Sequence, residues 1–503
     1  MSSVRQPGDG PLWSPWSALA FAAAVRIAVF PFAWNLYGDA PARLNAVRRW
    51  LEQPFFLRSF RGALQFGPLN VYLLGGLARL FPDPYVVPRL PSLVLGSLTA
   101  WPLYRLAEAR FGRRAAAVST WAFALYGLHV QASTTAASEG LFLFFLLWGL
   151  VFLDRGASGR PGLLAPAALA MACACAIRYD GYLYAPLSWL LLWPALRAGR
   201  LSSRAAALYA LGTLAVPLFS FWGNWVDLGD PLFLPHYIDA DHVRNAAIAS
   251  ARMGRAVWTG YCLTFWPANL AVELTPAVAG ALLLAGVEAL RRRRARGLLW
   301  LAAVPAAIFS LRGAFLLQFH PLARFTIPTA VLLLPYAGRG FELLLWGRSR
   351  RSQRALALGS LALALAFPGY LAFRTIGRGD PWAEGLRPIS PISTLPPDLE
   401  ATAEALGRLG RGKLVLVDGD PRYEDIPVSF YARLPHERLL EWREKPDRER
   451  IARGEVPDLV TLMPQSDLVA AGQAWAGGEA LVAFGQSYRL VERQGALSIY
   501  ARE

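Results

Sequence analysis

Long apolar segments recur along the first three quarters of the chain, and short polar segments separate them. A helix of roughly 17–25 mostly apolar residues can cross the hydrocarbon core of a bilayer. The pattern predicts about eleven transmembrane helices, at residues 12–34, 86–104, 115–131, 139–153, 161–177, 181–196, 203–225, 272–290, 297–311, 324–341 and 355–373. The expected fold class is therefore a polytopic α-helical membrane protein.

The polar connections between these segments are of two alternating kinds. One kind is short and rich in arginine, and reads RLAEARFGRR, DRGASGR, RAGRLSSR, RRRRAR and WGRSRRSQR. The other kind contains ASTTAAS, RYDG, residues 226–271 and RGAFLLQFHPLA. Since Arg-rich loops remain in the cytoplasm, the alternation predicts a cytoplasmic N-terminus and places residues 35–85 on the outer face. The helical patterns at 41–52 and 67–81 then predict interfacial helices on that face.

Composition and charge fit an integral membrane protein. Hydrophobic residues make up 55% of the chain and charged residues only 17%, which is too apolar for an ordinary soluble enzyme. The net charge of +16 comes from the first 373 residues, where 34 Lys or Arg outnumber 15 Asp or Glu. Such a basic membrane domain reflects topology and anionic headgroups. We therefore expect membrane lipids, and no nucleic acid, as partners.

The composition changes after residue 373. Residues 374–397 are rich in proline, which predicts a linker. Beyond them DLEATAEALGRLG predicts a helix, KLVLV, DLVTLM and ALVAF predict short buried strands, and YRLVERQGALSIYAR predicts a hairpin. We expect a transmembrane domain over 1–373 and a small α/β domain over 398–503. An odd number of spans would place this second domain outside the cytoplasm.

Ionisable residues gather at the outer ends of the predicted spans. They are Asp39, Glu139, Arg178, Asp180, His320 and Arg324. Each has a structural explanation when taken alone; Asp39, for example, could cap a helix at 41–52, and the others could lie at the interface. Ionisable groups at membrane depth are nevertheless costly and tend to be functional. The arginines offer sites for a phosphate, and the acids offer bases or metal ligands.

Arg26 stands apart from this group because it lies inside the first predicted span. We leave two roles open for it, a buried structural partner and a long-range contribution to the site.

The order of these motifs resembles the GT-C superfamily of membrane glycosyltransferases. An Asp after the first span is followed by PLNVYLL, RLPSLVLGSLTAWPLYRLAEARFGRR, SEGLFLFF, RYDG and ARFTIP. Over about residues 12–345 the chain looks like the bacterial branch related to protein O-mannosyltransferases and to the aminoarabinose transferase of lipid A. The resemblance implies a multi-pass enzyme of the bacterial inner membrane. It would transfer a sugar from a polyprenyl-phosphate donor to an acceptor on the extracytoplasmic face, by a single inverting displacement.

The resemblance also implies roles for particular residues. Asp39 matches the catalytic base or acceptor-orienting carboxylate, and Glu139 matches the family's second acid, so the resemblance implies that both are catalytic. Arg324 and Arg178 correspond to basic residues that bind the donor phosphate. The chain departs from the pattern in two places. Ala40 stands where many relatives have an acid. Residues 65–68 stand where the aminoarabinose branch has an acidic residue and a lysine that partly serve a metal.

These departures leave the cofactor and the substrates open. A divalent metal has no clear ligand set, although His236 lies in the outer loop where the aminoarabinose branch supplies a ligand. Neither the sugar nor the acceptor can be carried over from the family.

Two other classes of protein share some of these features. A transporter or flippase for a lipid-linked sugar would also need arginines for the lipid phosphate. Transporters, however, place charges near the bilayer midplane and often contain inverted repeats, whereas here the charges lie at one face and no repeat is visible. A structural subunit whose acids only cap helices is the second alternative. An assay of sugar transfer in membranes separates the enzyme from both.

Overall fold

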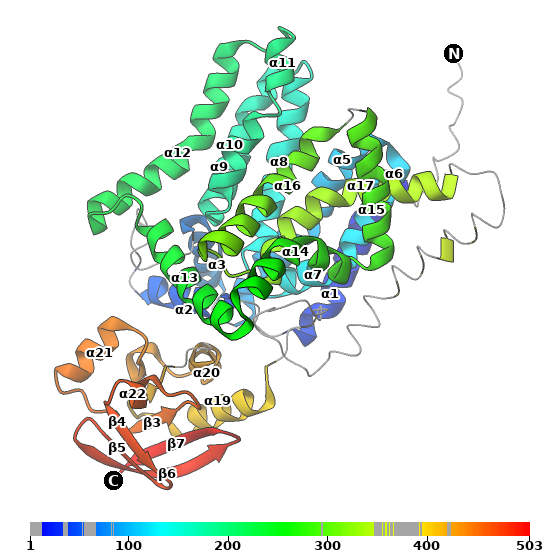
Figure 1. Cartoon of the computed structure of the whole chain (residues 1–503). Coiled ribbons are helices and arrows are strands. Elements are labelled where there is room, and N and C mark those ends of the chain that lie inside the picture. The colour runs from blue at the N-terminus through cyan, green and yellow to red at the C-terminus, as the bar shows by residue number, and fades with distance from the viewer. Residues whose placement is uncertain are drawn as a thin grey trace.

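The protein consists of a helical domain followed by a smaller domain built on a β-sheet (Figure 1). The computed structural model describes residues 13–33, 39–52, 67–81, 85–292, 295–346, 395–419 and 424–503, with a few isolated positions between these ranges. The predicted span at 355–373 and the predicted linker at 374–397 therefore lie almost entirely outside the described residues.

The helical domain is made of helices of very different lengths. They are α1 (Pro15–Val29), α2 (Ala40–Glu52), α3 (Pro68–Leu80), α4 (Leu90–Leu98), α5 (Ala100–Phe111), α6 (Arg113–Ala124), α7 (Gly127–Thr134), α8 (Glu139–Ala157), α9 (Leu164–Ile177), α10 (Gly181–Trp189), α11 (Trp193–Arg197), α12 (Ser203–Leu228), α13 (Phe233–Met253), α14 (Arg255–Glu273), α15 (Pro276–Arg292), α16 (Arg296–Leu311) and α17 (Ile327–Trp346). Short helical turns precede or follow several of them, including η3 (Val87–Arg89) and η6 (Ala323–Thr326).

Several predicted spans are broken in the structure. Within the described residues, four helical segments are long and apolar enough to cross a membrane: Pro15–Phe32, Glu139–Ala157, Ser203–Leu228 and Arg296–Leu316. Helices α14 and α15 form a fifth candidate if they are one span bent by 118°. The predicted span at 86–104 divides between α4 and α5, and the one at 115–131 divides between α6 and α7. The fold is helical as predicted, and the number of eleven spans stays a prediction.

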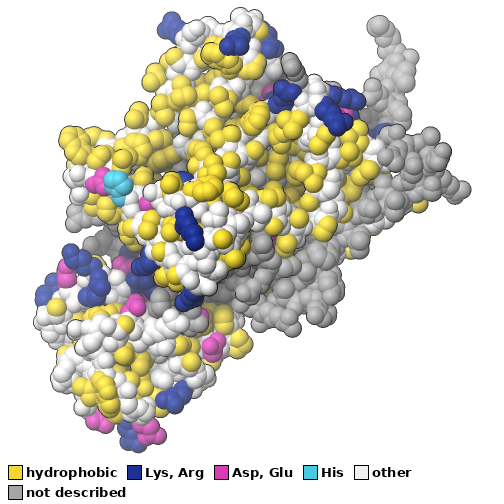
Figure 2. Space-filling view, viewed as in Figure 1, with side chains coloured by type: hydrophobic (Ala, Val, Ile, Leu, Met, Phe, Trp, Pro, Cys, Tyr) yellow, Lys and Arg dark blue, Asp and Glu magenta, His cyan; other side chains and the backbone are white. Residues whose placement is uncertain are grey.

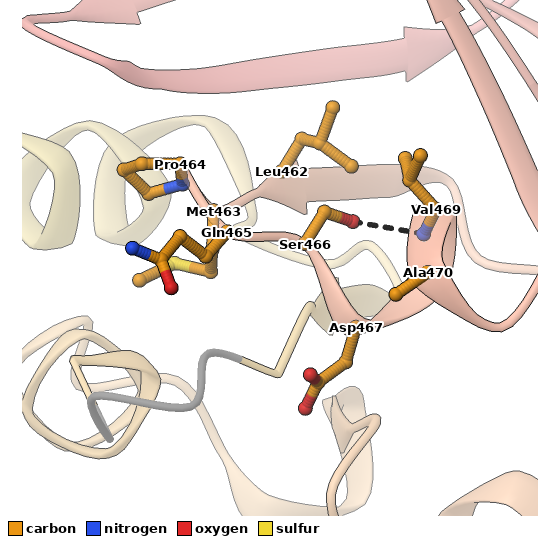
Figure 3. Close-up of a pocket in the computed structure, with 8 residues that line it drawn as sticks. All are labelled: Leu462, Met463, Pro464, Gln465, Ser466, Asp467, Val469 and Ala470. Carbon is orange, nitrogen blue, oxygen red and sulfur yellow. Dashed lines mark hydrogen bonds between the residues drawn. The ribbon is translucent and has the colours of Figure 1, made fainter. Parts of the chain in front are cut away.

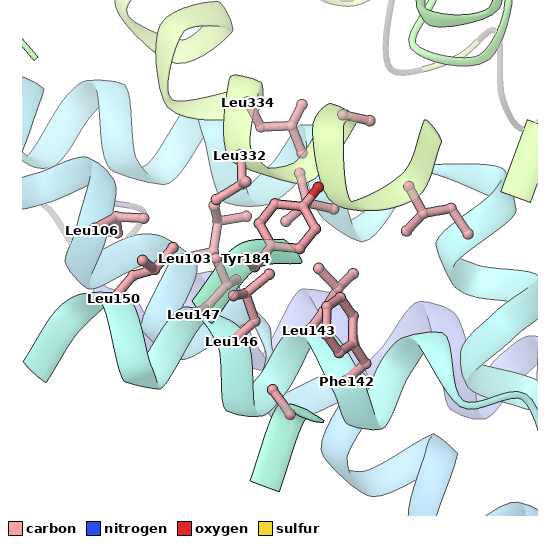
Figure 4. Close-up of a cluster of buried hydrophobic side chains, with 14 of the residues drawn as sticks. Leu103, Leu106, Phe142, Leu143, Leu146, Leu147, Leu150, Tyr184, Leu332 and Leu334 are labelled. Carbon is pink, nitrogen blue, oxygen red and sulfur yellow. The ribbon is translucent and has the colours of Figure 1, made fainter. Parts of the chain in front are cut away.

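Helix α8 lies at the centre of the bundle. Its leucines share one hydrophobic cluster with residues of α5, α10 and α17, and Figure 4 shows them beside Leu103 and Leu106, Tyr184 and Leu332. About 61% of α8 is buried, compared with 22% of the apolar window of α12. Because α12 exposes large side chains such as Leu211 and Trp222, its outer face suits contact with lipid.

The surface of the helical domain separates into an apolar belt and a basic rim. Figure 2 shows apolar side chains over most of the visible helical surface and Lys or Arg side chains along its upper edge. Helix α11, which precedes one of the Arg-rich connections, lies at the end of the domain farthest from the C-terminal domain (Figure 1). Arg110 and Asp154 form an ion pair between the last turn of α5 and the last turns of α8. The side of the membrane on which this end lies stays a prediction.

The C-terminal domain has a seven-stranded mixed sheet in the order β2-β1-β3-β7-β6-β5-β4. The strands are β1 (Val415–Val417), β2 (Leu439–Glu441), β3 (Leu459–Leu462), β4 (Ala474–Gly477), β5 (Ala480–Ala483), β6 (Gln486–Gln494) and β7 (Leu497–Arg502). Strands β1, β2 and β3 are parallel and the others are antiparallel. Parallel neighbours need crossover connections, and α20 (Asp425–Tyr431) and α21 (Lys445–Ala452) lie in them.

The sequence predicted most of this domain. The predicted helix is α19 (Pro397–Leu409), three predicted strands are β1, β3 and β5, and the predicted hairpin is β6–β7. Strands β2 and β4 were not predicted. Strand β2 has only three residues, and β4 is a largely exposed edge strand, so neither has a clear hydrophobic pattern.

Candidate active site

Asp39 lies at the start of α2 and forms ion pairs with two arginines. Its backbone carbonyl accepts the N–H of Arg43 at 2.9 Å, which begins the helix. Its side chain lies 3.6 Å from Nη2 of Arg43 and 3.3 Å from Nη1 of Arg324. Arg324 comes from η6, immediately before α17. Asp39 therefore both opens a helix and takes part in a charged network, so the two explanations given for it are not exclusive.

A second network surrounds Arg178, in the connection between α9 and α10. Its Nη1 donates to Oε1 of Glu139 at 2.5 Å, and its Nε donates to Oδ2 of Asp180 at 2.6 Å. The side chain of Ser138 accepts a further bond from Nη1 at 3.0 Å. The side chains of Glu139, Arg178 and Asp180 are only 2%, 10% and 9% exposed. The first residue of α8 and the loop before α10 are thus joined by one buried guanidinium.

The two networks are close enough to act on each other. Burial would raise the pKa of Asp39, but the positive charges of Arg324, Arg43 and Arg178 lower it below its ordinary value. Burial opposes the charge of Arg178, yet Asp180 and Glu139 raise its pKa. We call these six residues the acid–arginine cluster: Asp39, Arg43, Glu139, Arg178, Asp180 and Arg324. In it each carboxylate has a guanidinium partner within 3.6 Å.

Arg43 is the member of the cluster that sequence reasoning missed. The sequence predicted an interfacial helix over 41–52 and did not place Arg43 among the site residues, but its side chain is only 4% exposed. One signal was present in the sequence, since Asp39 and Arg43 are four residues apart and such pairs meet on a helix surface.

The two predicted histidines lie in different surroundings. The backbone N–H of His320 donates to Nδ1 of His242 at 3.3 Å, and its ring stacks on Trp258. His236 is 65% exposed near the start of α13, and its Nδ1 lies 2.7 Å from Asp230. His320 is thus close in sequence to Arg324 and packed against Trp258, whereas His236 is paired with Asp230 outside the cluster. Among the described residues, no group of three or more His, Cys, Asp or Glu side chains could hold a metal ion.

Arg26 has a structural environment of its own. Its side chain is fully buried, and its Nη2 lies 2.8 Å from Nδ1 of His129. It also donates to the carbonyl of Ala22 at 3.0 Å and lies over the ring of Phe123 at 4.7 Å. These contacts fit the first of the two roles considered for Arg26, that of a buried structural partner within the helical bundle.

A surface cavity in the C-terminal domain lies apart from the cluster. Figure 3 shows it at the end of β3, beside the short helix α22 (Asp467–Ala470). Its lining consists of Leu462, Met463, Pro464, Gln465, Ser466, Asp467, Val469 and Ala470. No member of the acid–arginine cluster lines it, so the candidate chemistry is located in the helical domain.

Part of the helical domain matches a known family. Residues 66–225 match the family model described as dolichyl-phosphate-mannose-protein mannosyltransferase. This range includes Glu139, Arg178 and Asp180, and it excludes Asp39 and Arg324. No curated protein matches the sequence.

Solved structures match the chain over almost its whole length. ArnT from Cupriavidus metallidurans in the apo state is 15% identical and superposes with a TM-score of 0.62, covering 97% of each chain. ArnT from the same organism bound to undecaprenyl phosphate is 14% identical, with a TM-score of 0.57 and the same coverage. The chain therefore has the ArnT fold in both domains. The resemblance to the GT-C superfamily predicted from the sequence is confirmed.

Proposed function

We propose that the protein is an integral membrane glycosyltransferase that transfers a sugar from a polyprenyl-phosphate donor to an acceptor on the extracytoplasmic face of a bacterial inner membrane. The observation that carries this proposal is the acid–arginine cluster, which unites residues from α2, α8, η6 and the loop before α10. The ArnT fold supports a lipid phosphate as ligand, because ArnT has been solved with undecaprenyl phosphate bound.

Arg324 and Arg178 are the residues that would bind the donor phosphate. A guanidinium can donate two parallel N–H bonds to phosphate oxygens. When the bond between the sugar and the phosphate breaks, its electron pair leaves with the phosphate, and the negative charge there increases. Arginines held at that position stabilise the developing charge. Glu139 and Asp180 would hold the guanidinium of Arg178 in place, since each accepts one of its N–H bonds.

Asp39 would accept the proton of the acceptor hydroxyl. The hydroxyl oxygen attacks the anomeric carbon as the proton moves to the carboxylate, so a single displacement inverts that carbon and needs no covalent sugar intermediate. With Arg324 and Arg43 beside it, Asp39 has a lowered pKa and is a weak base. A donor phosphate that draws Arg324 away from Asp39 would raise this pKa. Donor binding would therefore activate the base.

We assign no metal to this mechanism. The charges that the reaction requires are present in the cluster, and His236, the ligand candidate from the family resemblance, pairs with Asp230 outside it.

An assay of transfer in membranes tests the proposal. Membranes that contain the protein would receive a labelled polyprenyl-phosphate sugar and an extract of envelope acceptors. The expected products are free polyprenyl phosphate and a labelled acceptor in equal amounts. Movement of intact lipid-linked sugar across the bilayer, without cleavage, would instead support a flippase. A reporter fused after Glu503 tests the orientation, because the predicted topology places this end outside the cytoplasm.

A further inference from the structure

The C-terminal domain contacts the helix that follows Asp39. Figure 1 shows α2 at the edge of the helical domain nearest the C-terminal domain. Three polar residues of α2, namely Asn45, Arg48 and Arg49, form hydrogen bonds with that domain. Because Asp39 directly precedes α2, a contact that fixes the position of this helix also fixes the position of Asp39.

Glu441 receives two of these contacts. Nδ2 of Asn45 donates to its Oε1 at 3.2 Å, and Nη2 of Arg49 donates to its Oε2 at 2.8 Å. Nη1 of Arg49 also lies 3.1 Å from Glu444. The side chains of Arg49 and Glu441 are only 27% and 13% exposed. Charge-assisted bonds shielded from water in this way are stronger than ion pairs on an open surface.

Glu441, which accepts the hydrogen bonds of this contact, is part of the sheet. Glu441 is the last residue of β2 and lies opposite Val417 of β1 in the ladder. Its backbone N–H donates to Asp447 at 2.9 Å. The carboxylate that binds α2 is therefore held by a rigid element, which positions a partner more accurately than a loop does.

A second anchor lies beside the first. Nη2 of Arg48 donates to the carbonyl of Leu434 at 2.8 Å. The ring of Tyr85, just before η3, lies 5.0 Å from that of Phe430, and the guanidinium of Arg433 lies 4.6 Å from the Tyr85 ring. The C-terminal domain thus contacts two segments of the helical domain, α2 and the turn before α4.

The remaining sides of α2 belong to the core and the candidate active site. Leu44 and Val47 are buried in the main hydrophobic core, and Arg43 pairs with Asp39. A helix of 13 residues is marginally stable without tertiary contacts. Its orientation therefore depends on the groups that hold it on either side, the core and cluster on one and the C-terminal domain on the other.

We propose that Arg49, held by Glu441, is a positioning residue for sugar transfer, and that the C-terminal domain completes the active site by fixing α2 and so Asp39. This inference rests on the proposed function. Arg49 would contact neither donor nor acceptor. Its loss should lower the turnover number, because the base is misplaced, while the donor KM changes little, because Arg324 and Arg178 remain.

The test uses the full-length protein in lipid nanodiscs, with four variants. They are Arg49→Ala, Glu441→Ala, the double variant, and Arg49→Lys. Turnover is expressed per molecule that binds undecaprenyl phosphate, so that misfolded protein does not contribute. Each alanine variant should be about tenfold slower, since small misplacements of a catalytic group are costly. The double variant should lose far less than the product of the single losses, because Arg49 and Glu441 act through the contact that they share. Each also has partners of its own, Glu444 and His436 for Arg49 and Asn45 for Glu441, so the double variant can be somewhat slower than either single one. Arg49→Lys should recover part of the rate.

Arg408→Ala is the matched control, because Arg408 pairs with Glu492 at 2.6 Å within the C-terminal domain and does not reach α2. This variant should retain wild-type turnover. Wild-type turnover in Arg49→Ala, or a double variant whose loss is the product of the single losses, would overturn the proposal.

A different result would contradict the proposed function alone. If the wild-type protein binds undecaprenyl phosphate but transfers no sugar, the glycosyltransferase assignment fails. Hydrogen exchange of residues 40–52 then tests the contact itself. Faster exchange in Arg49→Ala than in Arg408→Ala supports a C-terminal domain that holds α2, and equal exchange contradicts it.

Discussion

Nη1 of Arg324 lies 3.3 Å from Oδ1 of Asp39, so the residue proposed to bind the donor phosphate is paired with the residue proposed to act as the base. A carboxylate paired in this way is weakly basic. A phosphate that competes for Arg324 weakens the pair and strengthens the base. This relationship links substrate binding to catalysis. Replacing Asp39 and replacing Arg324 should therefore change the kinetics of transfer in different ways.

Replacing Asp39 with asparagine should abolish transfer while the protein still inserts and folds. Asn is nearly isosteric with Asp and caps helices about as well, but its neutral amide cannot take the acceptor proton. The loss should be about 100-fold or more, as for other removed general bases. Transfer rates in membranes that contain equal amounts of folded protein provide the measurement. Activity within a few-fold of the wild type would show that Asp39 has only structural roles, at the start of α2 and in its ion pairs with Arg43 and Arg324.

Replacing Arg43 with glutamine should shift the acidic limb of the pH–activity profile to higher pH. Arg324, Arg43 and Arg178 lower the pKa of Asp39, so the wild-type carboxylate stays ionised to lower pH than an ordinary Asp. Removing one of these cations raises its pKa, and protonation then inactivates the enzyme sooner as the pH falls. The measurement is kcat/KM against pH. A profile lowered equally at every pH, without a shift, would assign Arg43 a purely structural role.

Replacing Glu139 with glutamine should mainly raise the donor KM. Glu139 accepts a 2.5 Å bond from Arg178 and is nearly inaccessible to solvent. Gln keeps the shape but loses the charge, so Arg178 is left with Asp180 as its charged partner in this network. Removal of one buried partner of an ion pair is strongly destabilising, and thermal unfolding should therefore be followed as well. A lowered kcat with an unchanged KM would instead place Glu139 in direct contact with the reacting groups.

The sequence predicted most helices of the helical domain, but not the positions where apolar segments break into two helices. The proposed interfacial helices at 41–52 and 67–81 are present as α2 and α3, although their position in a membrane stays a prediction. The helices α13 and α14 were missed, because residues 226–271 were assigned to an outer loop. The seven charged residues of this segment lie between positions 227 and 255, and residues 256–271, most of α14, contain none. A structureless connection of that length is rare in a compact domain, and this could have indicated helices.

The predicted site residues were grouped by topology rather than by contact. The alternation of Arg-rich connections placed Asp39, Glu139 and Arg324 at the same face, but no local pattern states which acid pairs with which arginine. Those pairs depend on how α2, α8 and η6 pack. The contact of Arg49 with Glu441 has no sequence signal at all, because it joins separate domains through side chains that look like ordinary surface charges.

Replacing Arg324 with lysine should raise the donor KM and lower kcat together. A lysine ammonium keeps the positive charge but lacks the planar fork that donates two N–H bonds to a phosphate. The deficit should be largest in the transition state, where the phosphate carries the most charge. Loss of one such contact costs roughly 3–4 kcal/mol in a site closed to water. Arg324 is 12% exposed, so a smaller loss, of about 10- to 100-fold in kcat/KM, is expected.

The alternative for Arg324 is that it only extends its charge toward lipid headgroups. Lys performs that role as well as Arg, and the kinetics of Arg324→Lys would then match the wild type. Arg339→Lys is a suitable control, since Arg339 pairs with Glu288 and Glu342 outside the cluster. Initial rates against donor concentration distinguish the two roles. Unchanged kinetics in Arg324→Lys would remove Arg324 from the phosphate site, whereas a loss in Arg324→Lys but not in Arg339→Lys would confirm it there.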